Sequence, residues 1–407
     1  MIPGQSDATV VSRAVLPGKV SDNFPGAELF RNSASREQRP DTVLEGAAEV
    51  ASWLQQVLED SVRKRASDIH FEPFESHLSI RIRVDGMMIP LVRKPVSWMA
   101  AIASRIKVMA DLDIAECRLP QDGRIVFPVD GHPVTLRVST ISTVSGESIV
   151  VRVLDQRAAP RNLESLGMPE DILGGFRECL KSPHGLIVIT GPTGSGKTTT
   201  LYGALKELNT PELKILSAED PVEYELEGVM QTAIQPEADV TFPSLLRSFL
   251  RQDPDVIVVG EMRDAETARI AVQAALTGHL VITTLHTQDS TSVVARMIDL
   301  GIEPYLIVST LVGVVAQRLV RRKCEACSGT GIGCADCLHT GYKGRIGLFE
   351  LFRPDRCMRE LIAEGASTTE LRQAARSGGM HSLREVGMAA VDAGLVSRVE
   401  VLSLSTD

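Results

Sequence analysis

The sequence has few aromatic residues, no long apolar run and no strong excess of charge. Aromatic side chains make up 4% of the 407 residues, so the core must be built from aliphatic side chains and methionine. Lys and Arg number 43 against 52 Asp and Glu, and the formal net charge of −9 argues against a protein that coats nucleic acid. The longest uncharged run, Ile270 to Gln288, carries too many polar residues for a membrane span.

Cysteine is scarce outside one short segment. Four of the seven cysteines lie close together, between Cys324 and Cys337, and the total is odd. This distribution is unlike a disulfide framework and favours a metal site in a reducing compartment. The N-terminus has no basic segment followed by an apolar one, so we predict no signal peptide and a cytosolic protein.

Composition and periodicity predict an N-terminal tail and a small domain. Residues 1–45 are rich in Pro, Gly, Ser, Asn and Asp, which predicts a disordered tail. Residues 46–155 predict a small α+β domain, which opens with an amphipathic helix that ends near Arg65. Within it, the alternation in 78–84 predicts a half-buried strand before an Asp-Gly turn. Further strands are predicted at 124–129, 134–139 and 148–154, a helix around 99–112, and a linker at 158–160.

Residues 156–353 show a different pattern, in which short apolar strands alternate with helices. The strands are predicted at 186–190, 214–218, 256–260 and 280–284. Strands that are apolar on both faces are typical of a parallel sheet covered by helices, so this part predicts an α/β domain. A Cys/Gly-rich insert occupies 323–345, and residues 354–407 predict a helical C-terminal subdomain.

One glycine-rich segment fits the phosphate-loop pattern in full. Residues 191–198 read Gly-x-x-x-x-Gly-Lys-Thr, after an apolar strand and before a helix. Glycines let backbone N–H groups wrap phosphates, and the helix N-terminus adds a favourable potential. We predict that Lys197 reaches the β- and γ-phosphates of ATP and that Thr198 holds Mg²⁺. The predicted nucleotide contacts are Gly191, Pro192, Thr193, Gly194, Ser195, Gly196, Lys197, Thr198 and Thr199.

Acidic residues follow two of the predicted strands. Glu261 comes directly after the run 256–260, although a glycine stands at the usual Walker-B aspartate position. We predict that Glu261 orients the attacking water, with Glu219, Asp220 and the further catalytic candidate Glu223 near Mg²⁺. Each of these carboxylates could instead cap the helix that follows its strand.

Two histidines bracket the strand predicted at 280–284. An imidazole can donate to a phosphate oxygen, so we predict His286 as a catalytic residue and His279 as a nucleotide contact. A purely structural hydrogen bond is the alternative for each of them.

Several segments resemble the secretion ATPases of type II secretion and type IV pili. Segments 191–198, 219–223, 250–255, 260–264 and 278–287 include that family's Walker A motif, Asp box, atypical Walker B motif and His box, in this order. Segments 66–72, 118–124 and 136–140 match family motifs in the first domain, and the resemblance covers about residues 47–405. It implies a RecA-like P-loop ATPase core, a smaller α+β (PAS-like) N-terminal domain and a zinc-binding hairpin insert.

The resemblance also implies how the protein works. It implies a homohexamer with ATP between the two domains, whose movement drives insertion of pilin-like subunits. Inner-membrane assembly-platform proteins would be the partners, on the cytoplasmic face of that membrane. By motif, the family's arginines correspond to Arg137, Arg152, Arg247, Arg251 and Arg345. Guanidinium groups stabilise charge on a transferring phosphoryl group, although each arginine could instead lie on a solvated face or in an ion pair.

The cysteines form two Cys-x-x-Cys units. Cys324, Cys327, Cys334 and Cys337 offer four thiolates, which suits a structural Zn²⁺ site with no open coordination position. Redox chemistry is the alternative, but it uses one such pair on a thioredoxin-like unit, which this sequence lacks. In the family this element is typical of secretion and pilus-extension members and absent from retraction motors, although the spacing between the pairs is shorter here.

Three rival functions stay open. A retraction motor is disfavoured by the cysteines, and a nucleotide-gated scaffold with negligible hydrolysis is suggested by Gly260 but opposed by Glu261. A DNA translocase is disfavoured by the net charge of −9, so we predict no nucleic-acid partner. Family members usually carry a further folded N-terminal domain, which residues 1–45 are too few to form. Docking is therefore expected to use another surface, or a tail that folds on its partner.

Overall fold

The structure is a computed structural model that describes residues 43–155, 162–330 and 332–404. Most of the predicted tail and the predicted linker at 158–160 lie outside the described residues. The first described helix, α1 (Val43–Arg63), begins inside the segment predicted as tail.

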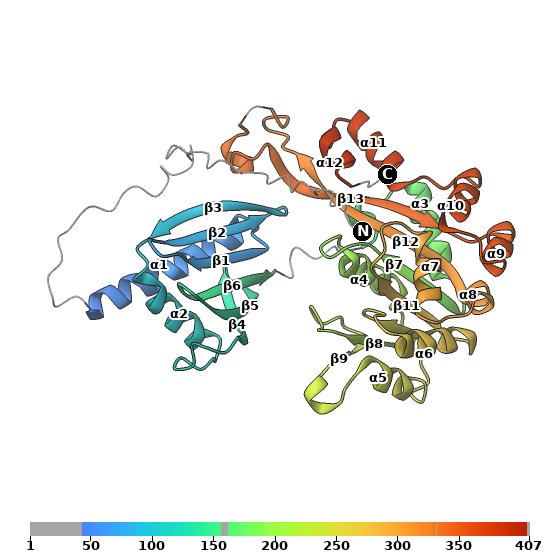
Figure 1. Cartoon of the computed structure of the whole chain (residues 1–407), viewed down its shortest axis with the longest axis horizontal. Helices are drawn as coiled ribbons and strands as arrows, with labels where there is room; N and C mark the ends of the chain where they lie inside the picture. The colour runs from blue at the N-terminus through green and yellow to red at the C-terminus, as the bar shows by residue number, and fades with distance from the viewer. Residues whose placement is uncertain (1–42, 156–161, 331, 405–407) are drawn as a thin grey trace, which may run out of the picture.

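Residues 43–155, here called the N-terminal unit, fold into one sheet with two helices (Figure 1). The strands lie in the order β3-β2-β1-β6-β5-β4, and every pairing is antiparallel. After α1 the elements are β1 (Asp68–Pro73), β2 (Leu78–Val84), β3 (Met87–Lys94), α2 (Trp98–Met109), β4 (Gln121–Val129), β5 (His132–Thr143) and β6 (Gly146–Leu154).

The alternation that predicted β2 also explains its two faces. Leu78, Ile80 and Ile82 are fully buried against the helices, and Arg81 and Arg83 project from the opposite face. That open face is charged, because the strand register places arginines side by side. Arg137 pairs with Arg124 on one side and with Arg152 on the other, and Arg152 pairs with Asp68. The N-terminal unit thus has one apolar face and one face lined with arginines.

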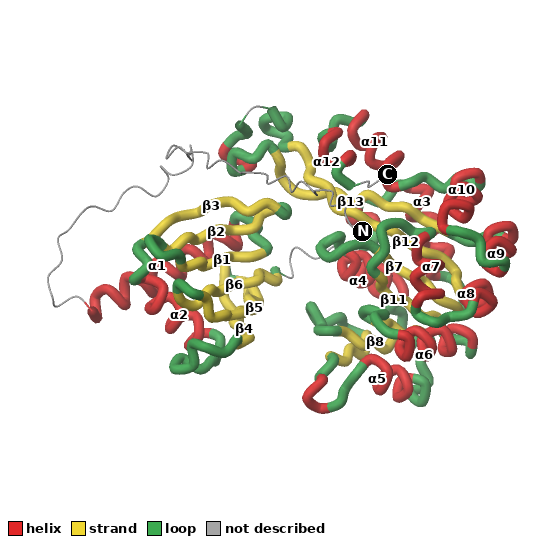
Figure 2. Tube along the Cα trace, viewed as in Figure 1, coloured by secondary structure: helices red, strands yellow, loops and turns green. Residues whose placement is uncertain are grey.

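Residues 162–404, the C-terminal unit, are built around a larger mixed sheet. Its order is β13-β12-β7-β11-β10-β8-β9, with helices packed on both faces (Figure 2). Its elements up to the last strand are η3 (Glu164–Leu166), α3 (Glu170–Leu180), β7 (Gly185–Thr190), α4 (Lys197–Leu208), β8 (Ile215–Glu219), β9 (Val229–Ala233), η4 (Pro236–Ala238), α5 (Phe242–Phe249), β10 (Val256–Val259), α6 (Ala265–Leu276), β11 (Leu280–Leu285), α7 (Ser292–Asp299), α8 (Pro304–Thr310), β12 (Leu311–Lys323), η5 (Ala335–Cys337) and β13 (Tyr342–Phe352).

The four predicted apolar strands are confirmed, and they pair in parallel as expected. Every residue of β7, β10 and β11 is buried, because helices cover both faces of the sheet. The prediction of a parallel sheet is incomplete, since β13 runs antiparallel to β12. The sequence pattern missed this pair because the Cys/Gly-rich segment interrupts it, although the two strands form one long hairpin that carries the cysteines.

The C-terminal helices begin where side-chain caps satisfy their first N–H groups. Ser367 and Ser382 form capping boxes with Glu370 and Glu385. The helices are α9 (Arg356–Ala363), α10 (Thr368–Ser377), α11 (Leu383–Asp392) and α12 (Arg398–Leu402), as predicted for the helical tail. Buried residues of α9 and α10 join the core of the larger sheet.

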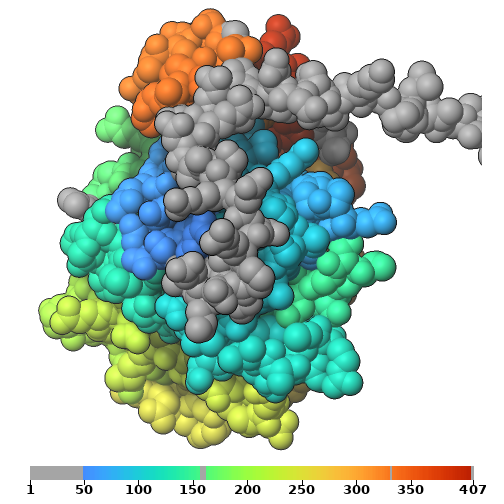
Figure 3. Space-filling model, turned by 90° about the vertical axis from the view of Figure 1, so that its left-hand side faces the viewer, coloured from blue at the N-terminus to red at the C-terminus, as the bar shows by residue number. Residues whose placement is uncertain are grey.

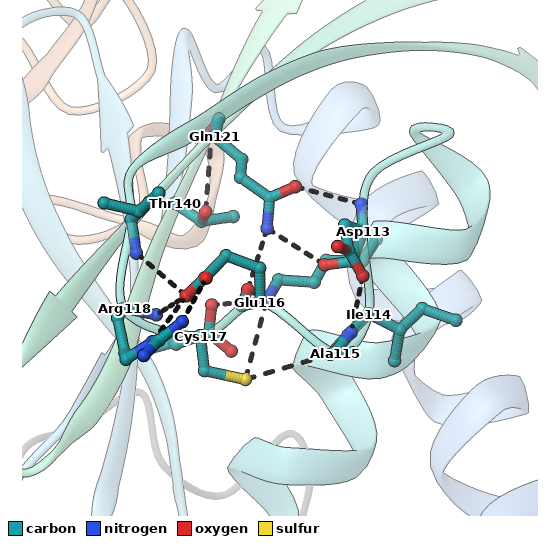
Figure 4. Close-up of polar contacts among 11 residues, drawn as sticks. Asp113, Ile114, Ala115, Glu116, Cys117, Arg118, Gln121 and Thr140 are labelled. Carbon is teal, nitrogen blue, oxygen red and sulfur yellow. Dashed lines mark hydrogen bonds and ion pairs between the residues drawn. The ribbon is translucent and has the colours of Figure 1, made fainter.

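A hydrogen-bonded loop follows α2 in the N-terminal unit (Figure 4). Gln121 donates from Nε2 to the carbonyl oxygens of Asp113 and Glu116, at 2.9 Å and 2.8 Å, and accepts from the Asp113 amide. The Arg118 side chain and backbone amide bond to Glu116 and hold the pKa of that carboxyl at about 2. Hydrogen bonds therefore hold the start of the segment 118–124 in place.

The buried side chain of Lys107 contacts this loop. The Lys107 side chain is fully buried, and its Nζ lies 2.5 Å from Glu147 Oε1 and donates to the Glu116 carbonyl at 2.8 Å. A buried ammonium needs such partners because it has lost its hydration.

Substituting Glu147→Gln should destabilise the protein by about 3–5 kcal/mol, since the charge of Lys107 would stay buried without its counter-ion. The Arg118→Ala variant is the control, because its side chain is 87% exposed in its own ion pair. We expect its free energy of unfolding to stay near the wild-type value in urea titrations. Equal stability of the two variants would contradict the assignment.

Candidate active site

The predicted phosphate loop connects β7, an inner strand of the larger sheet, to α4. Gly196 lies in the left-handed region with φ 89°, where a side chain is strained. A Cβ atom at Gly191 would lie 2.5 Å from both the Gln317 carbonyl oxygen and the Ser195 hydroxyl. Both glycines are therefore required by the packing of this loop against β12.

The loop contains a buried polar atom for which the described residues supply no partner. Ser195 Oγ is buried and has no hydrogen-bond partner within the described residues. The Lys197 side chain folds over the loop and donates to the carbonyl oxygens of Gly191 and Pro192 at 2.8 Å and 3.2 Å. A buried hydroxyl without a partner beside the N-terminus of α4 fits a phosphate oxygen. The residues present therefore fit a bound nucleotide.

Parallel pairing brings the other candidates to the same edge of the sheet. His286 follows β11, Glu261 follows β10, and Glu219 ends β8, so all three lie beyond carboxyl ends of adjacent strands. His286 Nδ1 lies 3.4 Å from Lys197 Nζ, and its Nε2 lies 3.1 Å from Glu261 Oε1. The structure thus connects the phosphate-loop lysine to the candidate water-orienting carboxylate through one imidazole.

Glu261 stays ionised at neutral pH. Partial burial acts against its charge, but the hydrogen bond from Arg263 at 2.8 Å and the charges of Arg263, His286 and Lys197 lower its pKa. Burial lowers the pKa of Lys197, and the Glu261 charge opposes this effect. An ionised carboxylate is the form that accepts a hydrogen bond from water, so this electrostatic setting suits the predicted role.

The Asp box, residues 219–223, is held by buried hydrogen bonds. Glu219 is 3% exposed, and its carboxylate accepts from Ser217 Oγ at 2.6 Å, from Gln231 Nε2 at 3.0 Å and from the Tyr202 hydroxyl. Protein donors therefore occupy both oxygens of the carboxylate that the sequence placed near Mg²⁺. Asp220 is more exposed and lies 3.8 Å from Arg263.

Among the five predicted arginines, Arg137 is the one whose described contacts reach the Asp box. It donates to the Val222 carbonyl oxygen at 3.0 Å, and another of its nitrogens lies 3.3 Å from Glu223. Arg152 is its neighbour in the strand register but bonds to Asp68 at 3.0 Å. One arginine-bearing strand of the N-terminal unit therefore contacts the Asp box.

Two predicted arginines lie at the C-terminal end of α5 instead, Arg247 in its last turn and Arg251 just after the helix. Arg247 pairs with Glu266 on α6, and Arg251 donates to the Arg247 carbonyl oxygen at 2.8 Å. Both side chains are solvent-exposed. This agrees with the alternative stated above, in which an arginine lies on a solvated face or in an ion pair. No described contact joins either side chain to the phosphate loop.

The fifth arginine, Arg345, lies at the base of the cysteine hairpin. Its side chain is 3.9 Å from Asp85, which accepts from the Gly344 amide at 2.7 Å and lies 3.9 Å from Arg65. The Asp-Gly turn after β2 therefore contacts the hairpin, which lies above the N-terminal unit in Figure 3. In this arrangement Arg345 joins the two units rather than the phosphate site.

His279 lies at the other end of β11 from His286. It precedes Leu280, which pairs with Gly185 at the start of β7, whereas the phosphate loop follows the end of β7. Its Nδ1 lies 2.9 Å from the Ala274 carbonyl oxygen. The structure therefore places His279 away from the phosphate loop, in the structural role that the sequence allowed for.

Three residues near the site were missed by the sequence reasoning. Gln317 accepts from Thr200 Oγ1 at 2.5 Å, Arg318 is 8% exposed and donates to the Gln288 carbonyl oxygen, and Tyr202 bonds to Glu219. Gln317 and Arg318 belong to β12, which lies more than one hundred residues from the phosphate loop in sequence. No local pattern connects such distant segments.

The cysteines come together as predicted. The sulfur atoms of Cys324, Cys327, Cys334 and Cys337 lie within 4.8 Å of one another. The contacts of 3.8 Å and 3.9 Å between them match the separation of about 3.8 Å that a tetrahedron with Zn–S bonds of ~2.3 Å requires. The donor set therefore fits Zn²⁺, held between β12 and β13.

The strand, glycine loop and helix define a P-loop nucleotide-binding protein. Residues 43–403 match the family described as Type II/IV secretion system protein, and the chain belongs to that family. It is 49% identical over 366 residues to the type II secretion system protein HxcR of Pseudomonas aeruginosa, covering 88% of this chain and 78% of that protein.

Two further relatives are named as ATPases. The type II secretion system ATPase E of Vibrio cholerae is 44% identical, over 96% of this chain and 81% of its own. The type IV pilus assembly ATPase PilB of Myxococcus xanthus is 43% identical, over 87% of this chain and 68% of its own.

Solved structures share the fold. The pilus retraction motor PilT with bound ADP superposes with a TM-score of 0.62 at 26% identity, covering 87% of this chain and 97% of that one. The ATPase DotB of Legionella pneumophila gives a TM-score of 0.69 at 23% identity, covering 87% and 95%. Among the described helices, none is long and apolar enough to cross a lipid bilayer.

Substituting Arg263→Gln should move the acid limb of the ATPase pH profile to higher pH. The variant loses the Arg263 hydrogen bond and charge that help to lower the pKa of Glu261, while burial still raises it, so the carboxylate protonates at a higher pH than in the wild type. The measurement is turnover against pH. Arg269→Gln changes an exposed side chain on α6, so it is the control and should keep the wild-type profile. An unshifted profile for Arg263→Gln would contradict this explanation of the Glu261 pKa.

Substituting Cys334→Ser should abolish zinc binding, because three thiolates and a hydroxyl form a much weaker site. Metal analysis by mass spectrometry should find about one zinc per chain in the wild type and little in the variant. Cys357→Ser is the control, since that cysteine is exposed and outside the cluster. Equal zinc content in both variants would refute the site.

Proposed function

We propose that this protein is an ATP-hydrolysing motor that drives assembly of pilin-like subunits, in type II secretion or in type IV pilus extension. The observation that carries the proposal is the contact chain from Lys197 through His286 to Glu261 at the edge of the phosphate loop. Such a chain places a cation for the phosphates and an ionised carboxylate for water in one site.

The phosphate loop would bind ATP. Its backbone N–H groups and the Ser195 hydroxyl would meet phosphate oxygens, and Lys197 would leave the loop carbonyl groups for the β- and γ-phosphates. Thr198, with Asp220 and Glu223 nearby, would hold Mg²⁺, which neutralises the charge that develops on the phosphates. Because protein donors occupy Glu219, we assign it no direct metal contact.

Glu261 would orient the attacking water, and His286 would keep that carboxylate facing the phosphates. Arginines of the N-terminal unit would stabilise the charge on the transferring group. Arg137 already contacts the Asp box, and Arg152 lies next to it on the same face. Hydrolysis would then depend on closure of the N-terminal unit over the site, which is the movement that performs work.

We further propose that the protein works as a homohexamer at the cytoplasmic face of the inner membrane. It would contact assembly-platform proteins there and act on pilin-like subunits through them. The family and the names of the relatives support this assignment. Arg247, Arg251 and Arg345, which lie apart from the phosphate loop within one chain, would have to reach ATP of a neighbouring subunit.

A retraction motor is the second candidate. The fold similarity to PilT favours it, but that identity is 26%, against 43% for PilB. The cysteine cluster also supports the secretion and extension side, on the resemblance described above.

The direct test is Glu261→Gln in the purified protein. We expect turnover to fall by more than about a hundredfold, since the uncharged amide is a poor acceptor for the proton of the attacking water. ATP binding, followed by equilibrium titration, should change little because the phosphate loop is intact.

The matched control is Glu364→Gln, a change at the exposed end of α9 that should leave turnover unaltered. Full turnover in Glu261→Gln would refute its role. Failure of the wild-type protein to hydrolyse ATP in the presence of acidic lipid and Mg²⁺ would refute the motor and favour a scaffold.

A further inference from the structure

A buried tyrosine connects the phosphate-loop helix to the Asp box. Tyr202 lies on α4, on the second turn after Lys197, and its side chain is fully buried. Its hydroxyl donates to Glu219, the first residue of the Asp box. The same hydroxyl oxygen accepts from the Glu223 backbone amide at 3.2 Å and from Gln231 Nε2 at 3.3 Å. One hydroxyl group therefore contacts both ends of the segment 219–223.

The Asp box is also where the N-terminal unit makes contact. Arg137 donates to the Val222 carbonyl oxygen and lies 3.3 Å from the Glu223 carboxylate. The amide that bonds to Tyr202 belongs to the peptide unit between Val222 and Glu223. The carbonyl oxygen of the same peptide unit, that of Val222, accepts a hydrogen bond from Arg137. A continuous path of hydrogen bonds thus runs from α4 to the arginine-lined face.

We propose that the Tyr202 hydroxyl is a positioning residue for hydrolysis, which sets the place of the Val222–Glu223 peptide relative to the phosphate loop and so sets where Arg137 docks. The inference rests on the proposed function and adds to it a residue that acts through the Asp box.

The chemistry of the group suits a fixed connection. Burial and the hydrogen bond to Glu219 raise the pKa of the Tyr202 hydroxyl, so it keeps its proton and always donates to the carboxylate. Ser217 and Gln231 both donate to Oε1 of Glu219, and within the described contacts Tyr202 is the donor to Oε2. Loss of the tyrosine hydrogen bond would therefore leave one oxygen of a buried carboxylate unsatisfied. The contact is therefore rigid.

A second tyrosine supplies a matched control. Tyr224 packs edge-on against Tyr202, with ring centroids 4.5 Å apart, and burial raises its pKa to about 12. Unlike Tyr202, its buried hydroxyl has no hydrogen-bond partner within the described chain. The substitutions Tyr202→Phe and Tyr224→Phe each remove one buried hydroxyl from the same cluster, but only the first removes the connection.

The experiment measures ATPase kinetics and ATP binding for both variants of the full-length protein. We expect Tyr202→Phe to lower kcat about tenfold with little change in ATP affinity, because a misplaced Asp box affects the reaction more than binding. Tyr224→Phe should behave as the wild type in both measurements. A loss confined to kcat separates positioning from general weakening of the fold.

A double-mutant cycle tests the path to the N-terminal unit. If Tyr202 acts through Arg137, then Tyr202→Phe should lower kcat much less in an Arg137→Gln background than in the wild type. Fully multiplicative effects would overturn the inference, as would equal kcat values for Tyr202→Phe and Tyr224→Phe in an active protein. Inactivity of the wild type would instead refute the proposed function.

Hydrogen exchange tests the contact if Tyr202→Phe does not fold. In the wild-type protein the amide of Glu223 should be strongly protected, because it donates to a buried hydroxyl. Rapid exchange at this amide in the folded wild-type protein would overturn the proposal without any variant.

Discussion

The parallel pairing of β7, β11, β10 and β8 is the constraint on which the site depends. Because these strands run in one direction, the segments that follow them emerge at one edge of the sheet. The phosphate loop, His286, Glu261 and the Asp box therefore meet, although they are spread over almost one hundred residues. Complete burial of β7, β10 and β11 makes this register costly to change.

The charges at this edge are divided between the two units. The C-terminal unit supplies Lys197, Arg263 and several carboxylates, and the N-terminal unit presents a row of arginines on its open face. In this structure Arg137 pairs with Glu223 of the C-terminal unit, whereas Arg152 pairs with Asp68 of its own unit. Binding of a polyanion between the units would offer the arginines a stronger partner, and in the proposed motor this would couple nucleotide binding to movement of the N-terminal unit.

Much of the fold could be predicted because its signals are local. The alternation in β2, the apolar runs of β7 and β11 and the glycine spacing of the phosphate loop each lie within a few residues. The pair β12 and β13 could not be predicted in this way, since residues 324–341, which carry the cysteines, separate the two strands in the sequence. The same limit applies to Gln317, whose contact with Thr200 joins positions 117 residues apart.

For the site, the sequence alone determined which chemical groups are present: a phosphate loop, a carboxylate after a buried strand, and four thiolates at zinc-ligand spacing. The tertiary structure decided which of them meet. It brought His286 between Lys197 and Glu261, placed His279 at the far end of the same strand, and placed Arg345 beside Asp85. Motifs specify short-range geometry, whereas strand direction and the docking of two units depend on packing throughout the chain.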